Sequence, residues 1–397
     1  MLSHLLKLMW NKRRANGLIF LEIILAFIVL FGVYAFGFYN LDRYSSPLGF
    51  SYENSIGVSV DLSKIIEESD SLGVVRFQKR VLRDVESLDG VASACFLGPV
   101  NPFGGNTWST SNDDAGFRVS TLLGMADENF GETLELTFRE GRWFTEADYA
   151  GKYEPVVVNG KFIDEYYPSA ASMVDSLVSV NGDKRIVGIV EDYKFQSNFA
   201  EEKPFTFISA KTYNGYGDDN FFSQLIIRTE PGRTADVEEP VYNLLVDATK
   251  STDVVIWNMA DDRKKANRPV VIPLIILISI SAFLLINIAL GLFGVLFTQI
   301  SHRRAEIGLR KAMGATPAEV TTQFVLEILI VTLAGLLLGL FFAVQVPLLD
   351  LLPIPGRFFY LGIAAAVATI LLIVTLCALI PSRQAAGLHP AHVLHEQ

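Results

Sequence analysis

The sequence predicts a membrane protein with four transmembrane helices and a large α+β extracytoplasmic domain between the first and second spans. Three observations predict this fold class. Half of the 397 residues are hydrophobic and only 19% are charged, whereas soluble proteins carry about a quarter of charged residues. The apolar residues gather in four blocks, each long enough for the roughly 20 residues that cross a bilayer. A long polar stretch, residues 42–268, separates the first block from the second.

The four apolar blocks are interpreted as spans at residues 17–41, 269–300, 322–349 and 358–380. The first block is longer than the apolar core of a typical signal peptide. The residues at its end, among them Phe38, Tyr39 and Leu41, make a poor cleavage site. We therefore expect an uncleaved anchor in the lipid bilayer, preceded by a basic segment at residues 1–16.

Lysine and arginine residues near the span ends predict the orientation, because they favour the cytoplasmic side. Those expected there are Lys7, Lys12, Arg13, Arg14, Arg303, Arg304, Arg310, Lys311 and Arg383. The loop at residues 350–357, between the third and fourth spans, offers only Arg357. Both termini, including the tail at 381–397, are therefore expected in the cytoplasm of a bacterium, with residues 42–268 outside its inner membrane.

The outer segment is acidic and poor in cysteine. It holds 37 acidic and 23 basic residues, a net charge of −14. This surplus argues against a nucleic-acid partner. Cys95 lies in this segment and Cys377 in the fourth span, so no disulfide is expected to stabilise the domain. It must be held by its own hydrophobic core, which a segment of this length can bury.

Local patterns predict mixed helices and strands in the outer segment. Helices are expected at residues 71–88 and 234–249, and strands at 91–97, 155–158, 177–180, 185–190, 222–228 and 253–257. Asn181-Gly182 is a hairpin signal. We expect two α+β halves flanking a β-rich insert at about residues 150–215. Residues 260–268 are helix-compatible and would continue the second span outward as a stalk.

The segment after the second span, residues 301–321, is predicted to form an elbow. Residues 303–313 form a short amphipathic helix, in which Glu306 and Arg310 can pair one turn apart. Gly314 stands where a left-handed helix cap belongs. Thr316, Pro317 and Glu319 then supply the start of a new helix that leads into the third span.

A rigid basic elbow at the cytoplasmic surface is suited to receive a push from a soluble partner. The residues assigned to this coupling are Arg303, Arg304, Glu306, Ile307, Leu309, Arg310, Lys311, Met313, Gly314, Ala315, Thr316 and Pro317. The alternative is that the basic residues among them serve only as topology signals.

Other polar or small residues in the spans have simpler explanations. Glu22 is expected to reach back to the cytoplasmic interface. Gly335 and Gly339 form a small-residue face suited to close helix packing, either within one subunit or between two. Asn287 is expected to make a buried hydrogen bond between helices. The histidines at 389, 392 and 395 are interrupted by Pro390 and are not expected to bind a metal.

Several motifs resemble one known family in the order in which they occur along the chain. EIGLRKAMGA at residues 306–315, followed by a membrane-entering helix, closely resembles the FtsX/MacB family of ABC-transporter permeases. Looser similarity lies in GRWF at 141–144, PVVVN at 155–159 and IVGIVEDYKF at 186–195. The closing PSRQAAGLHPAHVLHE at 381–396 looks like the family's tail, although the third histidine stands where arginine is common.

This resemblance implies a non-catalytic permease subunit of a dimer, formed with a second copy or a paralogue. A cytoplasmic ABC ATPase would bind each elbow, and ATP hydrolysis would move the outer domains, which is called mechanotransmission. No GxxxxGK[ST] phosphate loop occurs in the sequence, so ATP and Mg²⁺ are expected on a separate ATPase, with no cofactor in this chain. A periplasmic adaptor, an outer-membrane partner or a cell-wall partner is compatible with this arrangement.

Three functions therefore stay open. The favoured one is an ABC permease subunit for efflux or envelope maintenance. The second is an FtsX-like regulatory membrane protein that controls an extracytoplasmic partner such as a peptidoglycan hydrolase. The third is a membrane-bound enzyme or receptor. Residues 42–268 contain no histidine, and the chain has neither HExxH nor GxSxG, which makes acid–base chemistry in the outer domain a poor explanation.

Overall fold

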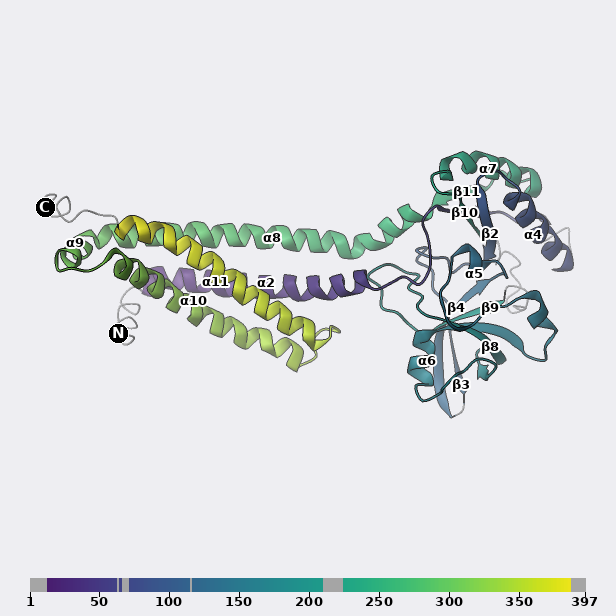
Figure 1. Cartoon of the computed structure of the whole chain (residues 1–397), viewed down its shortest axis with the longest axis horizontal. Coiled ribbons are helices and arrows are strands. Elements are labelled where there is room, and N and C mark those ends of the chain that lie inside the picture. Colours follow the sequence, from purple (N-terminus) through teal and green to yellow (C-terminus); the bar gives the residue numbers. More distant parts are fainter. Residues whose placement is uncertain (1–12, 63, 66–70, 115, 210–223, 387–397) are drawn as a thin grey trace. The chain divides into compact units, whose positions relative to one another are not determined.

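The computed structural model describes residues 13–62, 64–65, 71–114, 116–209 and 224–386. The chain divides into two compact units (Figure 1). The helical unit comprises Met1–Asp42 and Val270–Gln397, and the sheet domain comprises Arg43–Pro269. Each unit has its own hydrophobic core.

The helical unit is built mainly from long helices. They are α2 (Arg13–Ser45), α8 (Met259–His302), the short α9 (Arg304–Ala312), α10 (Pro317–Leu348) and α11 (Gly356–Ala386). Four of them, α2, α8, α10 and α11, are long and apolar enough to cross a membrane, as predicted. Helix α8 starts at Met259, so the helical continuation expected at residues 260–268 is confirmed.

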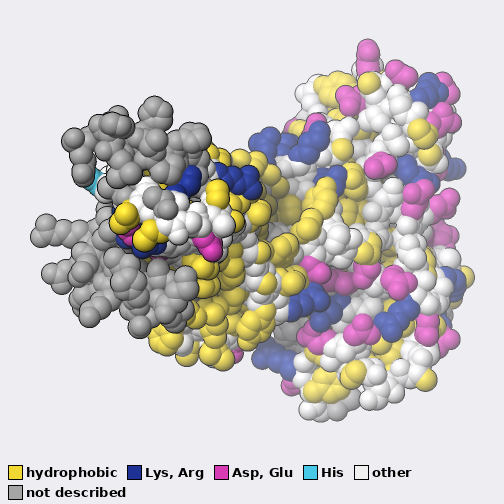
Figure 2. All heavy atoms as spheres, turned by 60° about the vertical axis from the view of Figure 1, so that its left-hand side comes forward, with side chains coloured by type: hydrophobic (Ala, Val, Ile, Leu, Met, Phe, Trp, Pro, Cys, Tyr) yellow, Lys and Arg dark blue, Asp and Glu magenta, His cyan; other side chains and the backbone are white. Residues whose placement is uncertain are grey.

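Apolar side chains at helical spacing hold these helices together. On α2, Ile19, Ile23 and Phe27 recur every four residues and are fully buried, which places them on one face of the helix. They share a cluster with Ile328 of α10, Ile370 of α11 and other residues of the four long helices. The outer surface of these helices is also apolar (Figure 2), as lipid contact requires.

In its described residues the sheet domain contains eleven strands and several helices. The strands are β1 (Ser55–Val60), β2 (Val91–Leu97), β3 (Ser109–Asp114), β4 (Phe117–Ala126), β5 (Phe138–Gly141), β6 (Glu154–Asn159), β7 (Leu177–Ser179), β8 (Asp183–Val190), β9 (Phe205–Ser209), β10 (Gln224–Thr229) and β11 (Val254–Asn258). The helices are α4 (Ser71–Glu86), α5 (Phe130–Thr133), α6 (Gly160–Tyr166) and α7 (Thr234–Thr249), with a 3₁₀ turn, η1 (Glu146–Ala150).

The strands form one sheet in the order β11-β1-β10-β2-β4-β9-β6-β8-β5, with β3 beside β4 and β7 beside β8. Among the described strands, β4–β9 and β6–β8 pair in parallel and the others pair antiparallel. The first lobe, β11-β1-β10-β2, is covered by α4 and α7, whose Val81 and Val241 are buried against Ile56 and Leu225 of the strands. The two ends of the domain sequence therefore build one lobe.

The second lobe contains β3 to β9 and is wider than the insert expected at about 150–215. The lobes meet where β2 pairs with β4 at a single position, Leu97 with Ala126, whereas β4 and β9 pair along five positions. Hydrogen bonding therefore groups β4 with the strands that follow it, and the second lobe begins after β2. Asn181 and Gly182 join β7 to β8 with φ of +52° and +94°, which confirms the predicted hairpin turn.

Candidate functional site: the elbow and the membrane connectors

The elbow, residues 301–321, contains the short helix that the sequence predicted. Helix α8 ends at His302, and Arg303 (φ −105°, ψ +13°) separates it from α9. Ile307 is buried, with 4% exposed, in a cluster with Ile300, Val320 and Phe324. Arg304 begins α9, and its side chain is outside the described part of the chain. The amphipathic pattern thus marks the face of α9 that packs on α10.

Helix α9 ends at Ala312, and Gly314 follows its C-cap, Met313, in the left-handed position that the sequence predicted. This glycine has φ +99°, a left-handed conformation that few other residues adopt readily. The Ala315 amide donates to the Arg310 carbonyl (3.0 Å), and the Gly314 amide donates to the Lys311 carbonyl (3.1 Å). These two bonds define a Schellman cap, which satisfies the last carbonyls of the helix.

The next helix, α10, begins with the predicted capping box. The Thr316 hydroxyl accepts a hydrogen bond from the Glu319 amide (3.3 Å), and the Glu319 carboxylate accepts one from the Thr316 amide (2.8 Å). Pro317 occupies the first helical position, where its missing N–H is no loss. The change of direction between α9 and α10 is therefore fixed by local bonds.

A polar network joins the elbow to α10. The Arg303 guanidinium donates to both oxygens of Glu327, at 3.0 and 3.1 Å, and each side chain is only 12% exposed. Arg310 donates to Glu306 within α9 and to Gln323 on α10, both at 2.6 Å. Gln323 in turn donates to Glu327 (3.2 Å). Arg303 and Arg310 therefore serve the internal structure of the elbow.

The opposite side of the elbow is exposed and partly apolar. Leu309 is 57% exposed and Met313 is 73% exposed. They stand four residues apart in sequence, so they lie on one face of α9 and its last turn. Lys311 and Ala315 are half-buried. The side chains of Leu309 and Met313 are therefore available to a partner.

The predicted small-residue face of α10 is used within this chain. A Cβ atom on Gly339 would lie 2.5 Å from Cδ1 of Phe27, and one on Gly335 would lie 3.1 Å from Cγ2 of Ile23. Both contacts are on α2. Of the two alternatives, packing within one subunit accounts for these glycines.

Asn287 differs from its expected role, whereas the expected reach of Glu22 to the cytoplasmic interface stays a prediction. A Cβ on Gly291 of α8 would lie 3.1 Å from a Glu22 carboxylate oxygen, so Glu22 lies against α8. The Asn287 amide donates to the Phe283 carbonyl (2.8 Å) in its own helix. The prediction of a hydrogen bond between helices is therefore wrong, because the Asn287 side chain donates to a carbonyl one turn earlier in its own helix. The three tail histidines lie outside the described residues.

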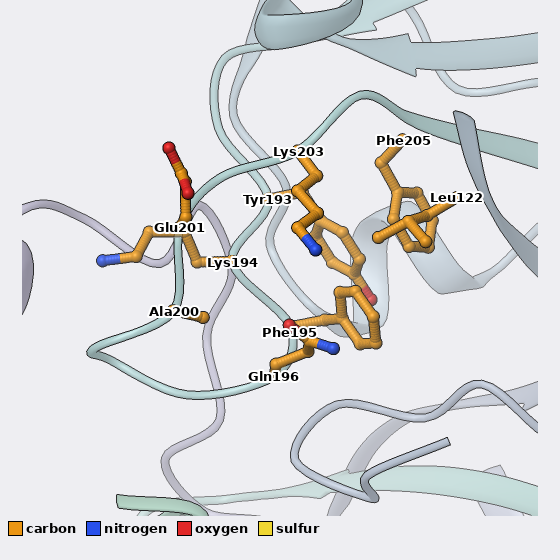
Figure 3. A pocket seen from close by; sticks show the side chains of 9 residues that line it. All are labelled: Leu122, Tyr193, Lys194, Phe195, Gln196, Ala200, Glu201, Lys203 and Phe205. Carbon is orange, nitrogen blue, oxygen red and sulfur yellow. The ribbon is translucent and has the colours of Figure 1, made fainter. Parts of the chain in front are cut away.

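Sequence reasoning missed a polar cluster in the sheet domain, here called the clasp: Arg43, Lys194, Asn198, Arg263 and Asn267. Lys194 is 5% exposed, and its amine donates to the Arg43 carbonyl (2.6 Å), the Ser46 hydroxyl (2.9 Å) and the Asn198 carbonyl (2.8 Å). Burial, followed by the Arg43 charge, lowers the pKa of this amine. Figure 3 shows its side chain directed away from the aromatic rings of Tyr193, Phe195 and Phe205.

The clasp holds the end of α2 and the start of α8 to one loop. The backbone amide of Asn198 donates to the side-chain oxygen of Asn267 (3.1 Å), and the side-chain nitrogen of Asn267 donates to the side-chain oxygen of Asn198 (3.0 Å). Arg263 donates to the Asn198 side chain (2.7 Å) and to the Tyr44 hydroxyl (3.1 Å). Both connecting segments are therefore bonded to the loop around Asn198. The cavity beside the loop holds only about 10 Å³, which is at most one water molecule.

The GRWF motif has a structural role in the second lobe. Asp148, with only 5% of its side chain exposed, accepts from Arg142 at 2.7 and 2.9 Å and from Arg185 at 3.2 Å. The hydrogen bonds from Arg142 hold the pKa of Asp148 well below its usual range. Gly141 (φ +71°) is required because a Cβ there would lie 2.4 Å from the Val187 carbonyl oxygen. The motif thus fixes β5 against β8.

Comparison with known proteins places these features in a family. The profile described as FtsX-like permease C-terminal matches residues 278–390, which include the elbow. The profile described as MacB-like periplasmic core domain matches residues 23–241, more than half of the chain. The chain belongs to the FtsX/MacB-like permease family. The resemblance found in the short motifs is thereby confirmed.

Curated relatives of this permease are longer than the matched region. The "Macrolide export ATP-binding/permease protein MacB" of Escherichia coli K12 is 25% identical over 270 residues, covering 65% of this chain and 41% of the relative. The protein of the same name from Shigella flexneri is 25% identical over 275 residues, with the same coverage. The permease therefore spans less than half of the length of these relatives.

Solved structures of low similarity also match. The periplasmic region of MacB from Actinobacillus actinomycetemcomitans has 12% identity and a TM-score of 0.39, covering 56% of this chain and 97% of that one. The extracellular domain of the noncanonic ABC-type transporter YknZ from Gram-positive bacteria has 13% identity and a TM-score of 0.37, covering 52% and 100%.

Proposed function

We propose that this permease is the membrane subunit of an ABC transporter and that a cytoplasmic ATPase docks on its elbow. ATP, with Mg²⁺, is bound and hydrolysed by that partner, and the resulting displacement of the elbow moves the sheet domain on the other side of the membrane. Two permease chains, each with an ATPase, form the working unit. The proposal covers efflux and envelope work alike, because both use the same coupling.

The observation that carries the proposal is the exposed pair on a rigid elbow. Leu309 and Met313 present apolar side chains at the polar end of the helical unit, next to Lys311. An exposed apolar pair on a helix fixed at both ends can fill a groove on a partner with little loss of conformational entropy. The names of the curated relatives join an ATP-binding part to a permease part, which supports an ATPase as this partner.

The internal bonds of Arg310 change which substitutions test docking. Because Arg310 holds Glu306 and Gln323, reversing its charge disturbs the elbow itself. The test therefore uses Leu309→Asp together with Met313→Asp, which alters only exposed side chains. The matched control is Val255→Asp, an exposed aliphatic residue of the sheet domain, 55% exposed.

The experiment tags the C-terminus, solubilises native membranes gently and identifies the co-purifying proteins. We expect a stoichiometric ATPase with its own phosphate loop, retained by the Val255→Asp variant and lost, by at least tenfold, in the double elbow variant. Equal ATPase recovery from all variants would remove the elbow as the docking site. The absence of any ATPase from the wild-type preparation would overturn the proposed function.

A further inference from the structure

The elbow is attached to the helical unit in two different ways. Along the chain it follows α8, but the helix is interrupted at Arg303. Through space it is attached to α10, by the Arg303–Glu327 ion pair and by the Arg310–Gln323 hydrogen bond. A displacement of the elbow can therefore pass along the backbone at Arg303 or through the side-chain network to α10.

The network to α10 joins the elbow to that helix through several side chains. Glu327 accepts a hydrogen bond from Arg303 on each of its oxygens and one from Gln323, so three hydrogen bonds fix its position. The Arg303 guanidinium also lies 5.9 Å from the ring centre of Phe324, and the apolar cluster of Ile300, Ile307, Val320 and Phe324 lies at the same junction. Removing either member of such a buried pair leaves an uncompensated charge, so separating the two side chains costs free energy.

Helix α10 is in turn fitted closely to α2. Gly335 and Gly339 lie two and three turns beyond Glu327, and they bring the α10 backbone against Ile23 and Phe27. The ring of Phe27 occupies the space that a side chain at position 339 would fill, so α2 and α10 can slide little against each other. Half of the most apolar stretch of α2 (50%) is buried in the unit, and 39% of that of α10.

Helix α8 is packed quite differently. Only 6% of its most apolar stretch is buried. Ile272, Ile276, Phe283 and Ile286 are between 51% and 65% exposed, so the first membrane-embedded part of α8 has few neighbours in this chain. Its buried residues in the helical core, such as Ile288 and Leu292, lie nearer the elbow.

We propose that Arg303 and Glu327 are positioning residues that make the elbow move with α10 and, through Gly335 and Gly339, with α2. The first part of α8 then shifts relative to this group. The source of the displacement rests on the proposed function, but the mechanical grouping of elbow, α10 and α2 does not. ATP-driven movement is thus delivered to the sheet domain as a displacement of α2 relative to α8.

A first experiment tests the grouping without any ATPase. The full chain, with Cys377→Ser, is placed in lipid nanodiscs with spin labels at Met313 and Leu25, the latter 53% exposed on α2. Electron-spin distance measurements should give a narrow distribution in the otherwise unaltered protein. Glu327→Gln should at least double its width, and the charge exchange Arg303→Glu with Glu327→Arg should restore it. The matched control is Asp350→Asn, which removes an exposed carboxylate outside the elbow, beyond the end of α10.

A second experiment tests whether ATP displaces α2 relative to α8 in the complex with the co-purified ATPase. Spin labels at Leu25 of α2 and Ile276 of α8 avoid the exposed face of the elbow. ATP with vanadate should shift their distance in the wild type, in Asp350→Asn and in the charge exchange. Glu327→Gln should keep the ATPase bound but lose the shift.

The outcomes separate this inference from the proposed function. An unchanged width in Glu327→Gln, or a full shift in that variant, would overturn the roles of Arg303 and Glu327 although the ATPase still binds. Loss of the ATPase from the wild type would overturn the proposed function alone, because the first experiment is decided without it.

Discussion

The elbow and the clasp both hold two helical segments in a fixed relation, but they are built from different kinds of contact. The cap at Gly314 and the capping box of Thr316 and Glu319 connect residues at most five positions apart. In the clasp, Lys194 bonds Arg43 across 151 positions, and Asn198 bonds Asn267 across 69. Local bonds shape one turn of chain, whereas the clasp requires the whole domain to be folded.

This difference predicts how far damage spreads. A local cap stabilises only the helix that it ends, so its loss is felt nearby. A buried group that joins distant segments contributes to the cooperative unfolding of its domain. The substitutions below test that contrast, from the largest expected effect to the smallest.

Lys194→Met should have the largest effect. The variant leaves buried acceptors, among them the carbonyls of Arg43 and Asn198, without their donor, which costs about 3 kcal/mol. The melting temperature of the full-length protein in detergent should fall by roughly 6–12 °C, measured by tryptophan fluorescence. Lys203→Met is the matched control, since that side chain is exposed and the change should be within about 0.5 kcal/mol. Equal melting of the two variants would refute the importance of the clasp.

Asp148→Asn should destabilise the sheet domain by about 2–3 kcal/mol at pH 7, because the Arg142 and Arg185 charges lose their buried partner. The pKa of Asp148 is lowered on folding, so the stabilisation is present above about pH 4 and is lost as the pH falls further. Wild type and variant should therefore converge in acid.

The control for this second substitution is Asp164→Asn, which breaks the exposed Arg139–Asp164 pair. It should change stability by less than about 1 kcal/mol at any pH. Urea unfolding at pH 7 and below pH 4 measures both variants. A difference between wild type and Asp148→Asn that persists unchanged in acid would contradict the role of the carboxylate charge.

Gly314→Ala should act locally, at the end of α9. A side chain at φ +99° costs about 1 kcal/mol, and the elbow should open more often while the melting temperature stays nearly constant. Hydrogen exchange of the amides of Gly314 and Ala315 should accelerate about fivefold. Gly294→Ala, in a helix and with no neighbour within 4 Å, is the control and should leave exchange unchanged.

Thr316→Ala should have the smallest effect, about 0.5–1 kcal/mol confined to the first turn of α10. Exchange of the Glu319 amide, which loses its acceptor, reports the change. Thr316→Ser keeps the hydroxyl and should behave as the wild type. A global loss of stability in the alanine variant would show that the elbow is not the local element described above.

The predictable parts of this protein were those set by short spacings. Helix α7 was expected at the residues where it occurs, because the apolar period of a helix is visible in sixteen consecutive residues. The pattern at residues 222–228 indicated a strand, and β10 is described from Gln224 to Thr229. That β10 lies between β1 and β2 was not predictable, because strand order depends on contacts between distant segments.

The site divides in the same way. The sequence marked Gly335 and Gly339 as a packing face but left its partner open, and the fold chose α2. It marked Arg310 as a contact for an ATPase, whereas folding turns this side chain toward Gln323. Spacing within a helix says which residues share a face, but only packing says what that face touches.

By itself, the amino-acid sequence determined four apolar helices, a polar domain between the first two, and an elbow with its caps. Each of these depends on hydrophobicity or on bonds between near neighbours, so a few consecutive residues suffice. Only the tertiary structure decided that Arg303 pairs with Glu327 and that Lys194 joins the start of the sheet domain to the loop around Asn198. Those contacts exist because folding brings distant residues together and removes water from around them, which no local pattern records.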